Sequence, residues 1–105
     1  MILIADGGST KSNWGLINYP NAPVFFNTEG YNPYFVDTST IVASMNEQLP
    51  DNLDRSAVKE VHYYGAGCSV PEKVEVVAKA MQAVFRKAKV VVGHDLLAAA
   101  RALLG

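Results

Sequence analysis

The chain has 105 residues, of which 50% are hydrophobic and 18% are charged, and its formal net charge is −1. This length and composition are typical of one globular domain and exclude a disordered chain, and the scattered basic residues exclude a nucleic-acid-binding surface. The single cysteine excludes an internal disulfide framework. No apolar run reaches the ~20 residues that cross a bilayer, and no signal peptide is recognisable. We therefore expect a cytoplasmic protein without a membrane partner.

Three short strands are expected in the first part of the chain. Residues 2–5 form a continuous apolar run, which is typical of a strand buried on both faces. Residues 12–18 alternate and predict a second strand, and residues 24–26 begin a third after Pro20 and Pro23. Because the connections are short, we predict that these strands form an antiparallel meander.

A helix is expected next, because the apolar spacing changes from two residues to three or four. Asp37 or Thr38 can cap this helix, and Pro50 ends it. Its apolar face consists of Ile41, Val42, Met45 and Leu49.

A strand, a second helix and another strand follow. Residues 58–64 predict the fourth strand and residues 89–93 the fifth. Between them, Ser69 and Glu72 match a capping box at the start of a helix. The face of this helix that we expect to be buried consists of residues three or four positions apart: Val70, Val74, Val77, Ala78, Met81, Val84 and Phe85.

The last predicted element is a helix over residues 96–104, with Asp95 as its cap. The order β-β-β-α-β-α-β-α then predicts an α/β fold, a mixed five-stranded sheet that begins with the antiparallel meander and carries helices on both faces. Only Arg101 is polar inside the last helix. A helix that is apolar nearly all round needs cover on several sides, so we expect a second lobe or a homodimer partner against it.

The first candidate for chemistry is the connection between the first two strands. It consists of Asp6, Gly7, Gly8, Ser9, Thr10 and Lys11. Glycines let the backbone approach a ligand, and successive amides there can bind an anion. Asp6 can hold Mg²⁺, through water because Mg²⁺ keeps its hydration shell. An ordinary hairpin turn is the alternative, since Asp-Gly-Gly also favours turns. A Walker A loop is excluded, because a strand and not a helix follows.

Two more strand ends carry candidate residues. Gly65, Ala66 and Gly67 follow the fourth strand, where they form either a tight turn or a docking place for an oxygen-rich ligand. Asp95 follows His94 after the fifth strand, and it is either a helix cap or a base that accepts a proton from a substrate hydroxyl.

The remaining candidates have little support. Cys68 precedes a predicted helix, whose N-terminus would lower the thiol pKa, but no catalytic partner accompanies it. His62 and His94 lack a second ligand at the spacing of a metal site, so we expect satisfied local residues.

Three segments together resemble a known family: D-G-G-S-T-K-S at residues 6–12, G-A-G-C at 65–68 and V-V-V-G-H-D-L-L-A-A-A-R-A at 90–102. With the order of elements, they resemble the N-terminal lobe of the BadF/BadG/BcrA/BcrD ATPase family, in its N-acetylglucosamine-kinase-like branch. The resemblance implies a ribonuclease-H-like fold of the actin/hexokinase/Hsp70 superfamily. It also implies that residues 1–105 form one lobe, and that a second lobe, absent from this chain, completes the cleft.

The resemblance also implies roles for individual residues. Residues 6–11 would bind the phosphates of ATP with Mg²⁺, and Asp95 would be the catalytic base that deprotonates the sugar. Asn32 would bind the sugar and residues 65–67 would line its pocket, together with His94. His94 departs from the Asn or Thr often found before that aspartate in the family, which leaves the identity of the sugar open.

The expected function is therefore ATP-dependent phosphoryl transfer to an amino sugar such as N-acetylglucosamine, with this chain alone inactive. An ATP-hydrolysing activase that acts on a partner enzyme is the first alternative. A non-catalytic ATP-binding scaffold is the second.

Overall fold

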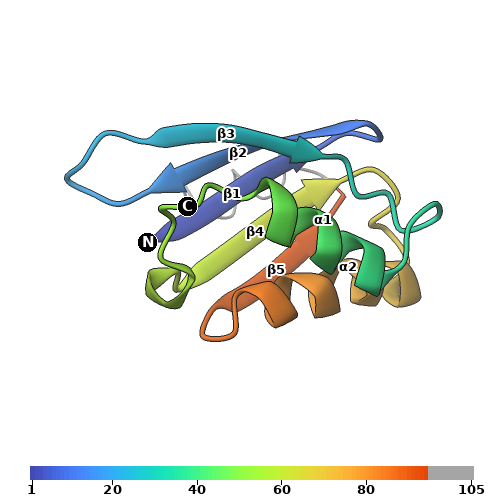
Figure 1. Cartoon of the computed structure of the whole chain (residues 1–105). Helices are drawn as coiled ribbons and strands as arrows, with labels where there is room; N and C mark the ends of the chain where they lie inside the picture. The colour runs from blue at the N-terminus through green and yellow to red at the C-terminus, as the bar shows by residue number, and fades with distance from the viewer. Residues whose placement is uncertain (95–105) are drawn as a thin grey trace.

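The computed structural model describes residues 1–94, which form a five-stranded sheet and two helices (Figure 1). The elements are β1 (Ile2–Gly7), β2 (Lys11–Ile17), β3 (Val24–Glu29), α1 (Thr38–Gln48), a short 3₁₀ turn (Arg55–Ala57), β4 (Glu60–Gly65), α2 (Pro71–Val84) and β5 (Lys89–Gly93). The predicted α/β fold class with a mixed five-stranded sheet is confirmed, whereas the described residues carry helices on one face of the sheet and not on both as predicted. The predicted helix over residues 96–104 and its cap Asp95 lie outside the described residues.

The sheet is mixed, with the strand order β3-β2-β1-β4-β5. Strands β1, β2 and β3 pair antiparallel, which confirms the predicted meander, and β1, β4 and β5 pair parallel. The register places Gly7 beside Gly65 and Tyr64 beside Gly93. The carboxyl ends of β1, β4 and β5 therefore meet at one edge of the sheet, at the right in Figure 1.

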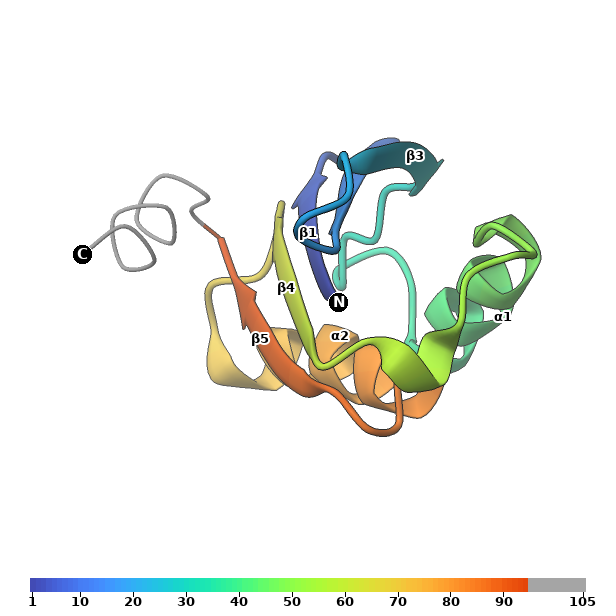
Figure 2. The same ribbon diagram turned by 90° about the vertical axis from the view of Figure 1, so that its left-hand side faces the viewer.

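Helices α1 and α2 pack against each other, α1 also against β3 and α2 against β5, so both cover the same face of the sheet (Figure 2). The core lies between this face and the helices. Its largest fully buried side chains include Trp14, Tyr31, Tyr63, Phe85, Met45 and Met81. Burial of each large apolar side chain contributes about 1.5–3 kcal/mol to stability. No helix among the described residues is long and apolar enough to span a membrane.

The start of α1 agrees with the sequence. Asp37 is the N-cap, and its carboxylate accepts hydrogen bonds from the Thr40 amide at 2.9 Å and the Ser39 hydroxyl at 3.1 Å. Hydrogen bonds from Thr40, and then from Ser39, hold the pKa of this carboxyl below its usual value. Ile41 and Met45 are fully buried as predicted.

The start of α2 differs from the prediction. The helix begins at Pro71, so the N-cap position falls to Val70, which forms no side-chain cap. Proline suits the first helical position because its missing N–H would be unpaired there anyway. Ser69 therefore lies one position before the N-cap, and Glu72 lies at the second helical position instead of the third. The predicted capping box is wrong. Val70 is exposed rather than buried.

The fourth strand also begins later than expected, at Glu60 instead of residue 58. The preceding residues form the 3₁₀ turn, which Asp54 caps by accepting a hydrogen bond from the Ser56 amide at 3.1 Å. On α2, Ala80 is fully buried and the predicted core residue Ala78 is only half-buried.

Candidate functional site

Four segments that the sequence singled out meet at the carboxyl edge of the sheet. They are the β1–β2 turn (residues 8–10), the loop over residues 30–33, the turn over residues 65–67, and the end of β5 at His94. The Ala66 amide donates a hydrogen bond of 3.1 Å to the Gly7 carbonyl, which ties the first turn to the third. This edge is where open α/β sheets place their ligands.

The β1–β2 turn is closed by a hydrogen bond of 2.8 Å from the Gly8 amide to the Lys11 carbonyl. Since the Gly8 amide is used there, the amides left for an anion are those of Ser9 and Thr10 at the tip. The side chains of Ser9, Thr10 and Lys11 are exposed and form no hydrogen bond with another described residue. The turn can therefore offer two amides, two hydroxyls and one ammonium group to a ligand.

Gly7 is required for space and not for backbone conformation. Among the described residues only Gly67 has a positive φ. A Cβ at position 7 would overlap the hydroxyl of Tyr63, whose ring lies directly beneath the end of β1. Gly7 therefore leaves the space that the Tyr63 ring occupies, which a side chain at position 7 would fill.

Asp6 lies at the same edge but points away from the helices. Leu3, Ala5 and Gly7 are buried in alternation with it, and its carboxylate lines a shallow apolar groove with Ile4 and Phe25 on the opposite face. In the described part of the chain, no group of three or more His, Cys, Asp or Glu residues is arranged to hold a metal. Asp6 alone fits Mg²⁺ that takes its other ligands from water and substrate phosphates.

The loop over residues 30–33 rests on the β1–β2 turn. A Cβ at Gly30 would overlap the Gly8 carbonyl oxygen and stand 2.8 Å from the Lys11 nitrogen. The Asn32 side-chain oxygen accepts a hydrogen bond of 3.0 Å from the Tyr34 amide. That oxygen is therefore committed to the loop's own turn, and the NH₂ group of Asn32 is the end that remains for a ligand.

The turn over residues 65–67 lies against the same loop. Gly67 has φ of +80°, which side chains rarely adopt, and an added Cβ would overlap the Asn32 side-chain oxygen. At Gly65 a Cβ would stand 2.6 Å from Cε1 of Tyr63. Gly67 thus lets the turn after β4 contact Asn32, and Gly65 leaves room for the Tyr63 ring.

Tyr63 is a residue of this site that the sequence did not single out. Its hydroxyl lies 2.8 Å from the Ser12 hydroxyl and accepts a hydrogen bond of 3.1 Å from the Tyr31 amide. The side chain is fully buried, and desolvation raises its pKa, so the phenol stays neutral. Its contacts depend on pairing between distant strands, and no local motif marks them.

Cys68 is buried, and the expectation that its pKa is lowered is wrong. Desolvation raises the thiol pKa to about 11. The side chain is only 1% exposed, and its sulfur lies 3.8 Å from the Ala66 carbonyl oxygen. The apolar surroundings outweigh the nearby helix end, so Cys68 is a structural residue of the core.

His62 is satisfied locally, as expected. Its Nδ1 lies 3.2 Å from the Tyr64 hydroxyl and its Nε2 lies 3.1 Å from a Glu60 carboxylate oxygen. His94 is exposed directly after β5, at the candidate site. Asp95 lies outside the described residues.

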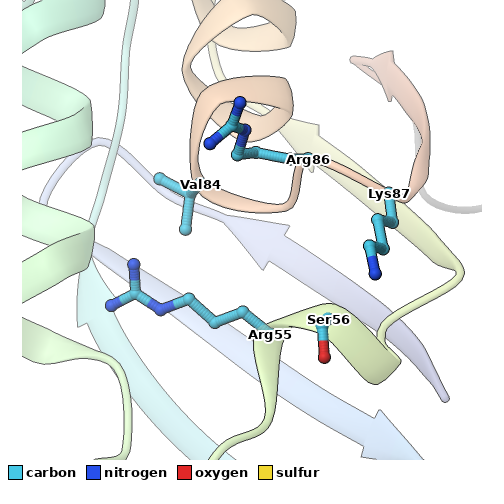
Figure 3. A pocket seen from close by; sticks show the side chains of 5 residues that line it. All are labelled: Arg55, Ser56, Val84, Arg86 and Lys87. Carbon is cyan, nitrogen blue, oxygen red and sulfur yellow. The ribbon is translucent and has the colours of Figure 1, made fainter.

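A basic cavity of about 570 Å³ lies between the 3₁₀ turn and the C-terminal end of α2 (Figure 3). Arg55, Arg86 and Lys87 line it together with Ser56 and Val84. Arg55 donates a hydrogen bond of 2.6 Å to Asn46, and Arg86 and Lys87 are exposed. None of the candidate residues at the carboxyl edge lines this cavity, so it takes no part in the site.

The fold and part of the sequence are shared with a solved protein. No family model and no curated protein matches the chain. The crystal structure of a Porphyromonas gingivalis protein named "Putative N-acetylglucosamine Kinase" matches all of the chain, with 33% identity and a TM-score of 0.82. The chain spans 38% of the length of that protein. The strand order β3-β2-β1-β4-β5 and this likeness together give the chain a kinase-like fold, that of the N-terminal lobe of actin-like ATPases.

Proposed function

We propose that the complete protein transfers a phosphoryl group from ATP to a hydroxyl of an amino sugar such as N-acetylglucosamine. This chain supplies one lobe and is inactive alone, and the protein belongs to the BadF/BadG/BcrA/BcrD family. The observation that carries the proposal is the convergence of three glycine-dependent segments at one sheet edge, in a fold shared with the Porphyromonas gingivalis protein.

The β1–β2 turn is the ATP side of the proposed site. The amides and hydroxyls of Ser9 and Thr10 and the ammonium group of Lys11 bind phosphate oxygens, exposed Gly8 keeps the backbone of the turn open to them, and Gly7 lets the turn sit above the Tyr63 ring. Asp6 holds Mg²⁺ through water. When bound, Mg²⁺ neutralises charge that develops on the phosphates during transfer.

The loop over residues 30–33 and the turn over residues 65–67 are the acceptor side. The NH₂ group of Asn32 donates to a sugar oxygen, and the backbone of Gly65, Ala66 and Gly67 lines the pocket with His94 beside it. Asp95, the next residue in the chain, accepts the proton of the sugar hydroxyl that attacks ATP.

The test is product formation by the complete protein with Mg²⁺, ATP and a panel of amino sugars and hexoses. An amino-sugar phosphate is the expected product. Asp95→Asn should retain sugar binding and lose about 10²–10⁴-fold in turnover, the contribution of a positioned base. Asp51→Asn, which changes an exposed aspartate outside the site, is the matched control.

Two results would contradict the proposal. ATP hydrolysis at the same rate with and without sugar would point to the activase. Absence of ATP turnover with every sugar of the panel would point to the scaffold.

A further inference from the structure

Tyr63 contacts both sides of the proposed site from below. Its hydroxyl lies 2.8 Å from Ser12, the second residue of β2 after the turn, and 3.1 Å from the amide of Tyr31, the neighbour of Asn32. Ser12 and Tyr63 are fully buried and Tyr31 is 2% exposed. Water therefore cannot replace this hydroxyl without opening the core, and its loss leaves two buried polar groups without a partner.

The ring of Tyr63 is held in one place. A Cβ at Gly7 or Gly65 would overlap or press on it, so the ring fills the space beneath both strand ends. The rings of Trp14 and Tyr31 lie 5.8 Å and 6.1 Å away, centroid to centroid. Since the ring cannot shift, its hydroxyl is a fixed point to which the turn and the loop are both attached.

We propose that Tyr63 is a positioning residue that joins the ATP-binding turn and the sugar-binding loop into one unit, so that both substrates depend on a single buried hydroxyl. The assignment of the two sides rests on the proposed function. Tyr63 touches neither substrate. It acts through Ser12 on the β1–β2 turn and through Tyr31 on the loop that carries Asn32.

Kinetics of the complete protein test this role. Tyr63→Phe should raise the KM for ATP and the KM for the sugar together, each by about tenfold, as expected for one lost buried hydrogen bond at each side. A merely structural role would only reduce the folded fraction, which lowers apparent kcat and leaves both KM values unchanged. That result, or a rise in only one KM, would overturn the proposal.

Tyr64→Phe is the matched control. It removes the same hydroxyl from the next residue of β4, where the hydroxyl contacts His62 and neither segment of the site. Both KM values should stay within about twofold of the wild type. Ser12→Ala serves as a second variant: its effect on the KM for ATP should not add to that of Tyr63→Phe, because both remove the same contact.

Amide hydrogen exchange of this chain tests the proposal without any activity. In Tyr63→Phe the amides of Tyr31 and Gly8, which are both hydrogen-bonded in the folded chain, should exchange about tenfold faster than in the wild type, and in Tyr64→Phe they should not. If exchange in either segment stayed unchanged, the Tyr63 hydroxyl would not hold both the turn and the loop, and the proposal would be refuted even if the complete protein were an active kinase. Faster exchange in both, with no sugar phosphorylated by the wild type, would keep the attachment and reject the proposed function.

Discussion

Gly30 lies against the carbonyl oxygen of Gly8 with no room for a side chain between them. The loop over residues 30–33 and the β1–β2 turn are therefore one packed unit, although a whole hairpin separates them in the sequence. The contact is between backbone atoms, so a neighbour cannot relieve it by changing its rotamer.

Gly30→Ala should for this reason destabilise the chain by about 1–3 kcal/mol, the usual cost of an overpacked site. The free energy of unfolding in urea measures the effect. Gly15→Ala is the matched control, because its new Cβ would lie 3.5 Å from the Phe25 ring, at ordinary contact distance. It should change stability by about 0.5 kcal/mol or less. Equal effects of the two variants would show that Gly30 has more room than described.

Much of the fold follows from local signals in the sequence. The apolar run at residues 2–5, the alternation after Lys11 and the cap at Asp37 each act over a few residues, and all three appear in the structure. The capping box at Ser69 failed for a local reason as well, because Pro71 decides where the helix begins. A competing signal two residues away was enough to shift the helix start.

The site was predictable only in part. The order of the strands implies that Gly7, Gly65 and His94 lie at one edge, and the structure places them there. The contacts that shape the site depend on register between strands far apart in the sequence, as between Tyr63 and Ser12. No local pattern encodes such a pair. The sequence predicts a role for Gly7, but the physical reason for a glycine at that position, the space that the Tyr63 ring occupies, is visible only in the structure.

Gly67→Ala should destabilise the chain by about 1–2 kcal/mol, because φ of +80° strains any side chain and the new Cβ overlaps Asn32. Part of this cost arises from the overlap alone. Asn32→Ala removes the overlapping oxygen, so the double variant should be more stable than the sum of the single effects predicts. Urea unfolding of the four proteins in a double-mutant cycle measures the difference. Strict additivity would mean that backbone strain accounts for the whole cost.

Cys68 should resist thiol reagents in the folded chain. With a pKa of about 11, about one thiol in a thousand is ionised at pH 8, and the sulfur is buried as well. Labelling by an aromatic disulfide reagent should be orders of magnitude slower in buffer than in urea, where the chain is unfolded. A folded-state rate close to that of a free cysteine would contradict both the burial and the raised pKa.

Asp37 should make stability depend on pH in acid. Hydrogen bonds from Thr40 and then Ser39 lower its folded-state pKa below the ordinary value of 3.8. The ionised cap therefore contributes stability above the unfolded-state pKa, and this contribution is lost as the pH falls through the folded-state pKa.

Asp37→Asn keeps a capping side chain but does not titrate. The stability advantage of the wild type over Asp37→Asn, measured by urea unfolding at pH 7, 5 and 3, should shrink only between pH 5 and 3. Ser39→Ala removes one donor and should raise the Asp37 pKa in an NMR titration. Parallel stability profiles of the wild type and Asp37→Asn down to pH 3 would show that the carboxylate charge contributes nothing to the cap.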